Sequence, residues 1–355
     1  MKTHFNILFC FLSITSFLWG QNFDANWIGH FSYLNIKKVV NADTKFYAAS
    51  ENALFSYDLQ TNRLSTITTI NGLSGELIST LHYSNEYQLL MIGYENGLIE
   101  VYSENDQEVL KVVDIVNKVT IPSSQKKINH FNELNSLVYI ATDYGISVYN
   151  LESLEFGDSY YIGANGSQIQ VSQTAIFNNE IYAACGSNSG IKKASLSNSN
   201  LTDFQLWSSL GSGDFKAVTV FDSGLYTVNS ANTLFEINGT TLTLLSNYSQ
   251  PVAELNTSNN SLLVTTNSKV YEYELGFTLT NTYSTNPDFD TNFNAALKID
   301  AVVYIGTTDY GVLKSNPLDP SGFDEIHPIG PLKNTVFSLS HGYGNLWVSY
   351  GDYSI

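Results

Sequence analysis

Two histidines are the residues in this sequence best placed for acid–base chemistry. His82 and His130 fall at similar places in two short, apolar-rich segments, LHYS and INHF. If these segments are strands that surround a channel, each imidazole could face that channel and exchange protons with a ligand. We predict instead that both are structural histidines held by hydrogen bonds, and we keep the channel-facing arrangement as the alternative.

The acidic run DFDTNFN is the segment that most resembles a metal loop. It places Asp288, Asp290 and Asn292 at alternate positions, as a calcium-binding loop begins. Such a loop needs a glycine at its sixth position and a glutamate at its twelfth, but Phe293 and Ile299 stand there. The sequence therefore predicts no calcium site, and the six histidines show no metal-ligand spacing either.

Two further candidates are a lysine pair and a thiol. Lys126 and Lys127 lie beside aromatic residues and could meet a phosphate or a sugar acid, although we predict a solvated loop end. Cys185 lies in the apolar run IYAACGS, which predicts a core side chain and not a nucleophile. Motifs of the types GxSxG, P-loop, CxxC and HExxH are absent from the sequence. We therefore predict a protein that is not an enzyme and has no cofactor.

The composition narrows the class of protein. The 355 residues carry a net charge of −17 and a single arginine, Arg63, which argues against binding to nucleic acid. Residues 1–20 combine Lys2, an apolar core and a small residue, as a secretory signal peptide does. Cleavage would remove Cys10 and leave Cys185 without a partner, so packing alone must stabilise the exported chain.

A repeated pattern explains how the chain is organised. Eight segments of the type YIATDYGISVYN recur at intervals of 37 to 48 residues, a period typical of β-propellers. Their second residues are Ala48, Ile92, Ile140, Ala183, Thr227, Val264, Ile305 and Val348.

Each repeat divides into four short strands separated by turns. In the second repeat these are residues 78–84, 89–94, 97–103 and 108–115. The second strand is apolar on both faces, which is expected of a strand between neighbouring blades. A glycine ends the turn that follows it, because a tight hairpin needs positive φ. These glycines are Gly97, Gly145, Gly190 and Gly311.

The motif Asp-Tyr-Gly occurs twice in these turns. We predict that Asp143 and Asp309 hydrogen-bond the backbone of their own turns, as turn aspartates commonly do, and that neither binds a metal or acts in catalysis.

The repeats predict an all-β protein with a seven-bladed propeller of four-stranded antiparallel blades over residues 21–334. Residues 335–355 would begin a second propeller that the sequence cuts short. The alternative is one eight-bladed ring in which residues 27–34 complete the last blade.

Several motifs go beyond a generic propeller. The stretches NGLSGELIST, KKINHF, DSYYIGANGS and GIKKASLSNSNLTDFQLW occur in this order, and together they resemble the N-terminal region of the PorZ family. This resemblance implies a non-enzymatic surface component of the type IX secretion system. Such a component would act at the outer face of the outer membrane with the sortase PorU and present anionic lipopolysaccharide for attachment to cargo.

Two other classes of propeller remain open. The blade motif also resembles the extracytoplasmic sensor propellers of hybrid two-component regulators, which would have a transmembrane helix and a kinase downstream. A polysaccharide-cleaving propeller would need a cluster of Tyr, His, Arg or carboxylate side chains at one face. With one arginine in the chain, this enzyme is the weaker alternative.

Overall fold

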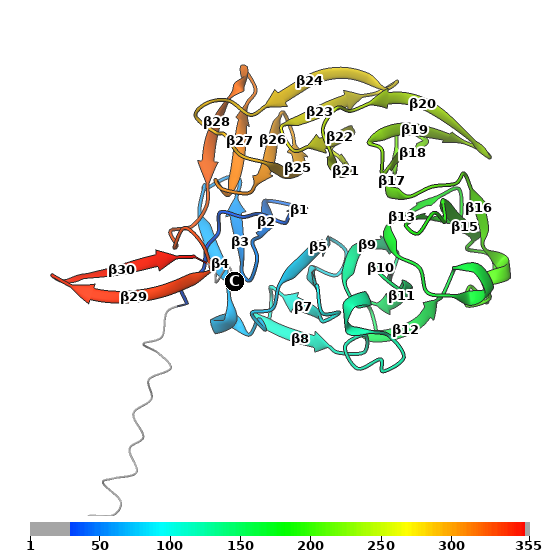
Figure 1. Cartoon of the computed structure of the whole chain (residues 1–355), viewed down its shortest axis with the longest axis horizontal. Coiled ribbons are helices and arrows are strands. Elements are labelled where there is room, and N and C mark those ends of the chain that lie inside the picture. The colour runs from blue at the N-terminus through cyan, green and yellow to red at the C-terminus, as the bar shows by residue number, and fades with distance from the viewer. Residues whose placement is uncertain (1–28, 352–355) are drawn as a thin grey trace, which may run out of the picture. The chain divides into compact units, whose positions relative to one another are not determined.

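The computed structural model describes residues 29–351. The chain divides into two compact units, residues 1–30 and residues 31–355, and the strands all lie in the second. The predicted signal peptide lies outside the described residues. In the second unit, seven four-stranded sheets follow one another around a ring (Figure 1). We number these sheets blade 1 to blade 7 in chain order.

Each blade is an antiparallel meander whose first strand lies innermost. The innermost strands are β1 (Lys38–Ala42), β5 (Ile78–Ser84), β9 (Ile128–Leu134), β13 (Val171–Phe177), β17 (Phe215–Phe221), β21 (Val252–Ser258) and β25 (Phe293–Ile299). The second strands are β2 (Lys45–Ala49), β6 (Leu89–Tyr94), β10 (Leu137–Thr142), β14 (Glu180–Cys185), β18 (Gly224–Asn229), β22 (Ser261–Thr266) and β26 (Val302–Thr307).

The outer half of each blade completes the sheet. The third strands are β3 (Leu54–Asp58), β7 (Ile99–Ser103), β11 (Gly145–Asn150), β15 (Ile191–Ser195), β19 (Thr233–Asn238), β23 (Lys269–Glu274) and β27 (Val312–Asn316). The outermost strands are β4 (Leu64–Ile67), β8 (Glu108–Val112), β12 (Glu155–Tyr160), β16 (Ser208–Leu210), β20 (Thr241–Asn247), β24 (Thr278–Ser284) and β28 (Asp319–Ile326).

Helical structure within residues 29–351 is confined to short 3-10 turns. These are η2 (Thr69–Asn71), η3 (Ser123–Gln125), η4 (Ala164–Gly166) and η5 (Phe204–Leu206). None of the helices in this range is long and apolar enough to cross a membrane.

The ring closes after seven blades. Each innermost strand contacts the next one, and β25 of the last blade contacts β1 of the first. The remaining strands, β29 (Val336–Gly342) and β30 (Asn345–Tyr350), form a separate two-stranded hairpin. The seven-bladed prediction is therefore confirmed, and the eight-bladed ring is wrong. That the hairpin begins a second propeller stays a prediction.

Apolar clusters hold neighbouring blades together. In the described part of the chain, one cluster of buried side chains lies between each pair of adjacent blades. The second strand contributes to two of them because alternate side chains point to opposite faces of a sheet. In β10, Tyr139 and Ala141 pack towards blade 4, while Val138 and Ile140 pack towards blade 2. This explains why the repeated second strand is largely apolar on both faces.

A hydroxyl group at the end of the second strand fixes the repeated hairpin. Thr142 Oγ1 accepts a hydrogen bond from the backbone N–H of Tyr144 at 3.3 Å and donates to the carbonyl of Gly145 at 2.9 Å. Thr307 makes the equivalent bonds to Tyr310 and Gly311 in blade 7. The glycines themselves adopt the positive φ that the sequence predicts.

The prediction for the two turn aspartates is wrong because threonine already satisfies the turn backbone. Asp143 Oδ1 instead accepts hydrogen bonds from the side-chain amides of Asn129, at 2.8 Å, and Gln170, at 3.0 Å. Gln170 precedes the first strand of blade 4, so this carboxylate joins two blades. Asp309 Oδ2 accepts a hydrogen bond from Thr291 Oγ1 at 3.0 Å.

The hairpin geometry yields a stability test at Gly145. A Cβ atom at this position, where φ is +145°, would lie 2.3 Å from the carbonyl oxygen of Tyr160. We expect Gly145→Ala to lower the free energy of unfolding by at least about 3 kcal/mol. The backbone strain of an alanine at positive φ adds to the collision of its Cβ atom with the Tyr160 carbonyl oxygen. The matched control is Gly239→Ala, where φ is also positive at +63° but nothing lies within 4 Å. There the loss should be about 1 kcal/mol. Equal losses in urea unfolding would contradict this explanation.

Candidate functional site

The innermost strands surround a channel that contains two cavities. The first, which we call the basic cavity, has a volume of about 170 Å³ and is lined by residues at or just before the starts of the innermost strands. The second has a volume of about 330 Å³ and lies beside residues further along the same strands. Lys38 and His130 line both cavities, so the two are neighbours within one channel.

Charged side chains from several blades meet in the basic cavity. Lys37, Lys38, Lys216 and Glu254 all line it. Glu254 forms an ion pair with Lys38 and accepts a hydrogen bond from the backbone N–H of Ala296 at 2.8 Å. It therefore connects blades 6, 1 and 7. The three lysines and one glutamate that line the cavity carry a formal charge of +2 in a chain whose net charge is −17.

Two buried polar atoms at this cavity have no hydrogen-bond partner among the described residues. They are Ser79 Oγ and His130 Nδ1. Burial lowers the pKa of His130 well below its ordinary value, and the charges of Lys38 and His82 lower it further. The ring is therefore neutral at pH 7. The sequence predicts a histidine held by hydrogen bonds, but its Nδ1 has none among the described residues. The alternative, in which the imidazole faces the channel, describes His130 correctly.

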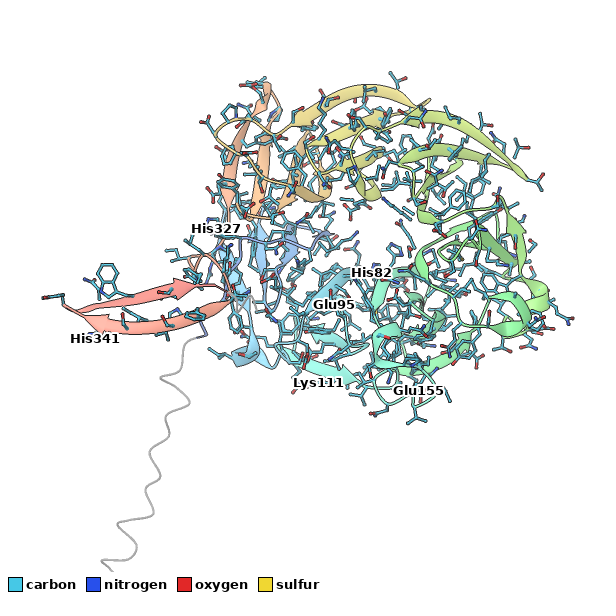
Figure 2. The ribbon with its side chains drawn as sticks, in the orientation of Figure 1. His82, Glu95, Lys111, Glu155, His327 and His341 are labelled. Carbon is cyan, nitrogen blue, oxygen red and sulfur yellow. The ribbon has the colours of Figure 1, made fainter. Side chains whose placement is uncertain are left out.

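His82 lines the second cavity and is held by a hydrogen bond, as predicted. Its Nε2 lies 2.6 Å from Glu133 Oε2, and Ser84 Oγ donates to the other carboxylate oxygen at 2.8 Å. Figure 2 shows His82 close to the middle of the ring. Burial alone would raise the pKa of Glu133, but the hydrogen bonds from His82 and Ser84 outweigh burial and lower it. The contact links β5 to β9, and therefore blade 2 to blade 3.

The lysine pair of the sequence divides into one buried and one exposed residue. Lys126 is only 8% exposed, and its Nζ donates to the carbonyl of Val116 at 2.5 Å. The solvated loop end is therefore wrong for Lys126, because the loop after β8 folds over its side chain. Lys127 is half exposed and lies 3.7 Å from Glu95 Oε1, as a solvated residue would.

The remaining candidates are the DFDTNFN segment and Cys185. The backbone N–H of Asp288 donates to Asn286 Oδ1 at 2.9 Å, and the carbonyl of Asn292 accepts from Thr308 N–H at 3.0 Å. Across residues 29–351, no group of three His, Cys, Asp or Glu side chains is placed to hold a metal ion. Cys185 is fully buried as predicted, and burial raises the pKa of its thiol to about 12.

Two buried carboxylates that the sequence does not single out lie on third strands, away from the channel. Glu100 in β7 accepts a hydrogen bond from Tyr94 and lies 3.6 Å from the Lys111 ammonium. Glu272 in β23 forms an ion pair with Lys298. Burial alone would raise the pKa of Glu272, but hydrogen bonds, above all from Lys298, outweigh burial and lower it. Each carboxylate therefore pairs with a lysine on another strand.

Sequence reasoning misses the charged residues of the channel. Lys37, Lys38, Lys216 and Glu254 stand far apart in the sequence and match no motif. One signal could have found them: all four fall in or directly before the first strands of their repeats. In a propeller, these strands surround the channel.

The fold and the channel define a seven-bladed β-propeller whose interior is polar and carries charged groups. A family model described as the N-terminal β-propeller domain of PorZ, of the type IX secretion system, matches residues 46–208. This range runs from the second strand of blade 1 to the outermost strand of blade 4. Over these residues, the chain matches the PorZ family.

Solved structures agree with this fold. PorZ of Porphyromonas gingivalis, described as an essential bacterial surface component of the type IX secretion system, superposes with a TM-score of 0.75 at 17% identity. The match covers 92% of this chain and 43% of that one, so this chain spans less than half the length of the PorZ structure. The computationally designed protein Ika8 matches with a TM-score of 0.52 at 13% identity, over 78% of this chain and 95% of its own. No curated protein sequence matches significantly.

The buried carboxylate of blade 6 yields a test with a matched control. Glu272 is 1% exposed, whereas Glu274, which also pairs with Lys298, is 49% exposed. We expect Glu272→Gln to lower the free energy of unfolding at pH 7 by about 3 kcal/mol, since it leaves Lys298 poorly compensated. Glu274→Gln should change it by at most about 1 kcal/mol.

The contribution of Glu272 to the free energy of unfolding should fall as the pH falls. The folded-state pKa of Glu272 is lowered, so its contribution is complete above the unfolded value of about 4.3 and is lost as the pH falls through the folded pKa. The difference between the parent and Glu272→Gln should therefore shrink below about pH 4. Chemical unfolding at pH 7 and pH 3.5 measures both quantities, and a difference that grows in acid would contradict this assignment.

Proposed function

We propose that this chain is the N-terminal propeller of a type IX secretion component that acts at the outer surface of the outer membrane. The observation that carries the proposal is the family match over blades 1 to 4. The agreement of the complete ring with the PorZ structure supports it. In this proposal, the predicted signal peptide exports the chain, and the propeller functions as part of a longer surface protein.

The propeller acts as a scaffold without catalysis of its own. It positions the sortase PorU and presents anionic lipopolysaccharide for attachment to secreted cargo. The state of the candidate groups supports a binding role. Cys185 is buried with a raised pKa, and Glu100 and Glu272 are each paired with a lysine. The polar side chains that gather at the channel are suited to binding ligands.

The test is genetic and uses the whole protein. Disrupting the gene in its natural host should leave cargo with uncleaved C-terminal signals and should remove it from the cell surface. The intact gene should restore processing. The matched comparison uses Gly145→Ala, which should restore less because it destabilises blade 3, and Gly239→Ala, which should restore fully. Cargo is measured by immunoblot of surface and periplasmic fractions.

Two results would overturn the proposal. Normal cargo processing in the disrupted strain would exclude a secretion role. A change in transcription with normal secretion would identify a sensor propeller of a two-component regulator. Surface cross-linking that recovers PorU with the intact protein would support the scaffold role, and its absence in a strain that expresses both proteins would contradict that role.

A further inference from the structure

We propose that the basic cavity binds a phosphate group, which Lys37, Lys38 and Lys216 surround in the channel. This inference stands on the cavity alone and does not depend on the secretion role.

The charge of the cavity matches that of a phosphate monoester. Lys37, Lys38 and Lys216 contribute three positive charges and Glu254 one negative charge, which leaves +2. A phosphate monoester carries about −1.5 to −2 at pH 7. Because the whole chain has a net charge of −17, an anion is not attracted by the protein in general. The lysines of this cavity supply a local positive charge.

The three lysines differ in what holds them. Lys38 is paired with Glu254, and Lys216 Nζ donates to Asn232 Oδ1 at 3.0 Å. These contacts hold two of the three ammonium groups before a ligand arrives. Within residues 29–351, the Lys37 ammonium has neither an ion pair nor a hydrogen bond. It is therefore the cation most available to an incoming anion.

Neutral donors complete the site. Ser79 Oγ and His130 Nδ1 are buried at the cavity without partners. A buried polar atom without a partner destabilises the fold by about 1–3 kcal/mol, so such atoms are uncommon unless a ligand or water satisfies them. A ligand oxygen would accept from the serine hydroxyl, or from a neutral imidazole that carries its proton on Nδ1, after a small movement of these side chains, because neither atom is open to the cavity in this structure.

The size of the cavity limits the ligand. Its volume of about 170 Å³ lies below the range of roughly 300–1,000 Å³ that is usual for drug-sized ligands. A phosphate ion or the phosphate end of a sugar phosphate suits it better than a polymer segment. These two sources share one chemistry, and the experiment separates them.

The experiment is calorimetric titration of the purified full chain with inorganic phosphate in a chloride buffer of low ionic strength. We expect saturable binding to one site. Lys37→Gln should weaken it at least about tenfold, because a charge-assisted hydrogen bond is lost. Ser79→Ala should weaken it several-fold. The matched control is Lys127→Gln, because Lys127 is half exposed, lies beside Glu95 and does not line the cavity. It should bind as the parent does.

Every outcome supports or overturns the proposal. Tighter binding of glucose 1-phosphate than of phosphate would support a phosphate ester as the ligand, and the reverse would support the free ion. Tighter binding of glucuronate than of either would overturn the phosphate assignment in favour of a carboxylate. No saturable binding would mean that only water satisfies the cavity. Equal weakening by Lys37→Gln and Lys127→Gln would mean that the anion does not bind in the channel.

A spectroscopic readout locates the ligand independently of affinity. Phosphate should shift the imidazole NMR signals of His130 and leave those of His327 unchanged, because His327 lies near the outer strand β28. Thermal unfolding of Lys37→Gln without ligand should match that of the parent, since its ammonium contacts no described partner. The secretion assay and this titration can fail separately, so neither result depends on the other.

Discussion

The structure depends on the contact that closes the ring. Each blade is built from one continuous segment, so among residues 29–351 no strand from one end of the chain completes a sheet at the other. Closure rests instead on the segment that precedes β1. The backbone N–H of Ile36 donates to Thr307 at 2.8 Å, and that of Gly311 donates to Leu34 at 2.9 Å.

Packing reinforces this closure. Ile36 is completely buried in the cluster between blades 7 and 1. A Cβ atom on Gly306 would lie 2.7 Å from the Ile36 side chain, so the glycine allows β26 and the segment before β1 to approach. Burying an isoleucine of this kind contributes about 1.5–3 kcal/mol. The hydrogen bonds and this side chain together replace the interlocked strand of other propellers.

The channel exists only while the ring is closed. Glu254 reaches past blade 7 to Lys38 of blade 1, and Asn294 Nδ2 donates to the carbonyl of Ile36 at 2.9 Å. These contacts join residues that are more than 200 positions apart in the sequence. The basic cavity is therefore a property of the closed ring, and a loss of closure would disperse its charges.

Local patterns in the sequence account for most of the fold. The repeat interval, the apolar second strands and the hairpin glycines are each dictated within one blade, so one sequence suffices to find them. The predictions fail for Asp143, which accepts from Gln170 of the next blade, and for Lys126, which a folded loop covers. The prediction for His130 fails because its Nδ1 has no partner among the described residues. These surroundings form only when the ring and its loops are folded, and no local pattern reports them.

The candidate site, too, is only partly predictable from local patterns. The sequence identifies His82 and His130 as candidates, but their different surroundings depend on Glu133 and Lys38. Fold alone does not define function, since propellers serve both binding and catalysis. The match to the PorZ family model motivates the genetic test, and the channel supplies the chemistry that titration can test.

The most direct measurement is native-state hydrogen exchange at the amides of Ile36 and Gly311, which close the ring. If closure is an integral part of the fold, both amides should exchange only through global unfolding, with the same free energy of opening as Ile140 in the central strand of blade 3. Exchange through a separate opening of much lower free energy would contradict the account, because the ring would then open without unfolding and the channel would not be a fixed site.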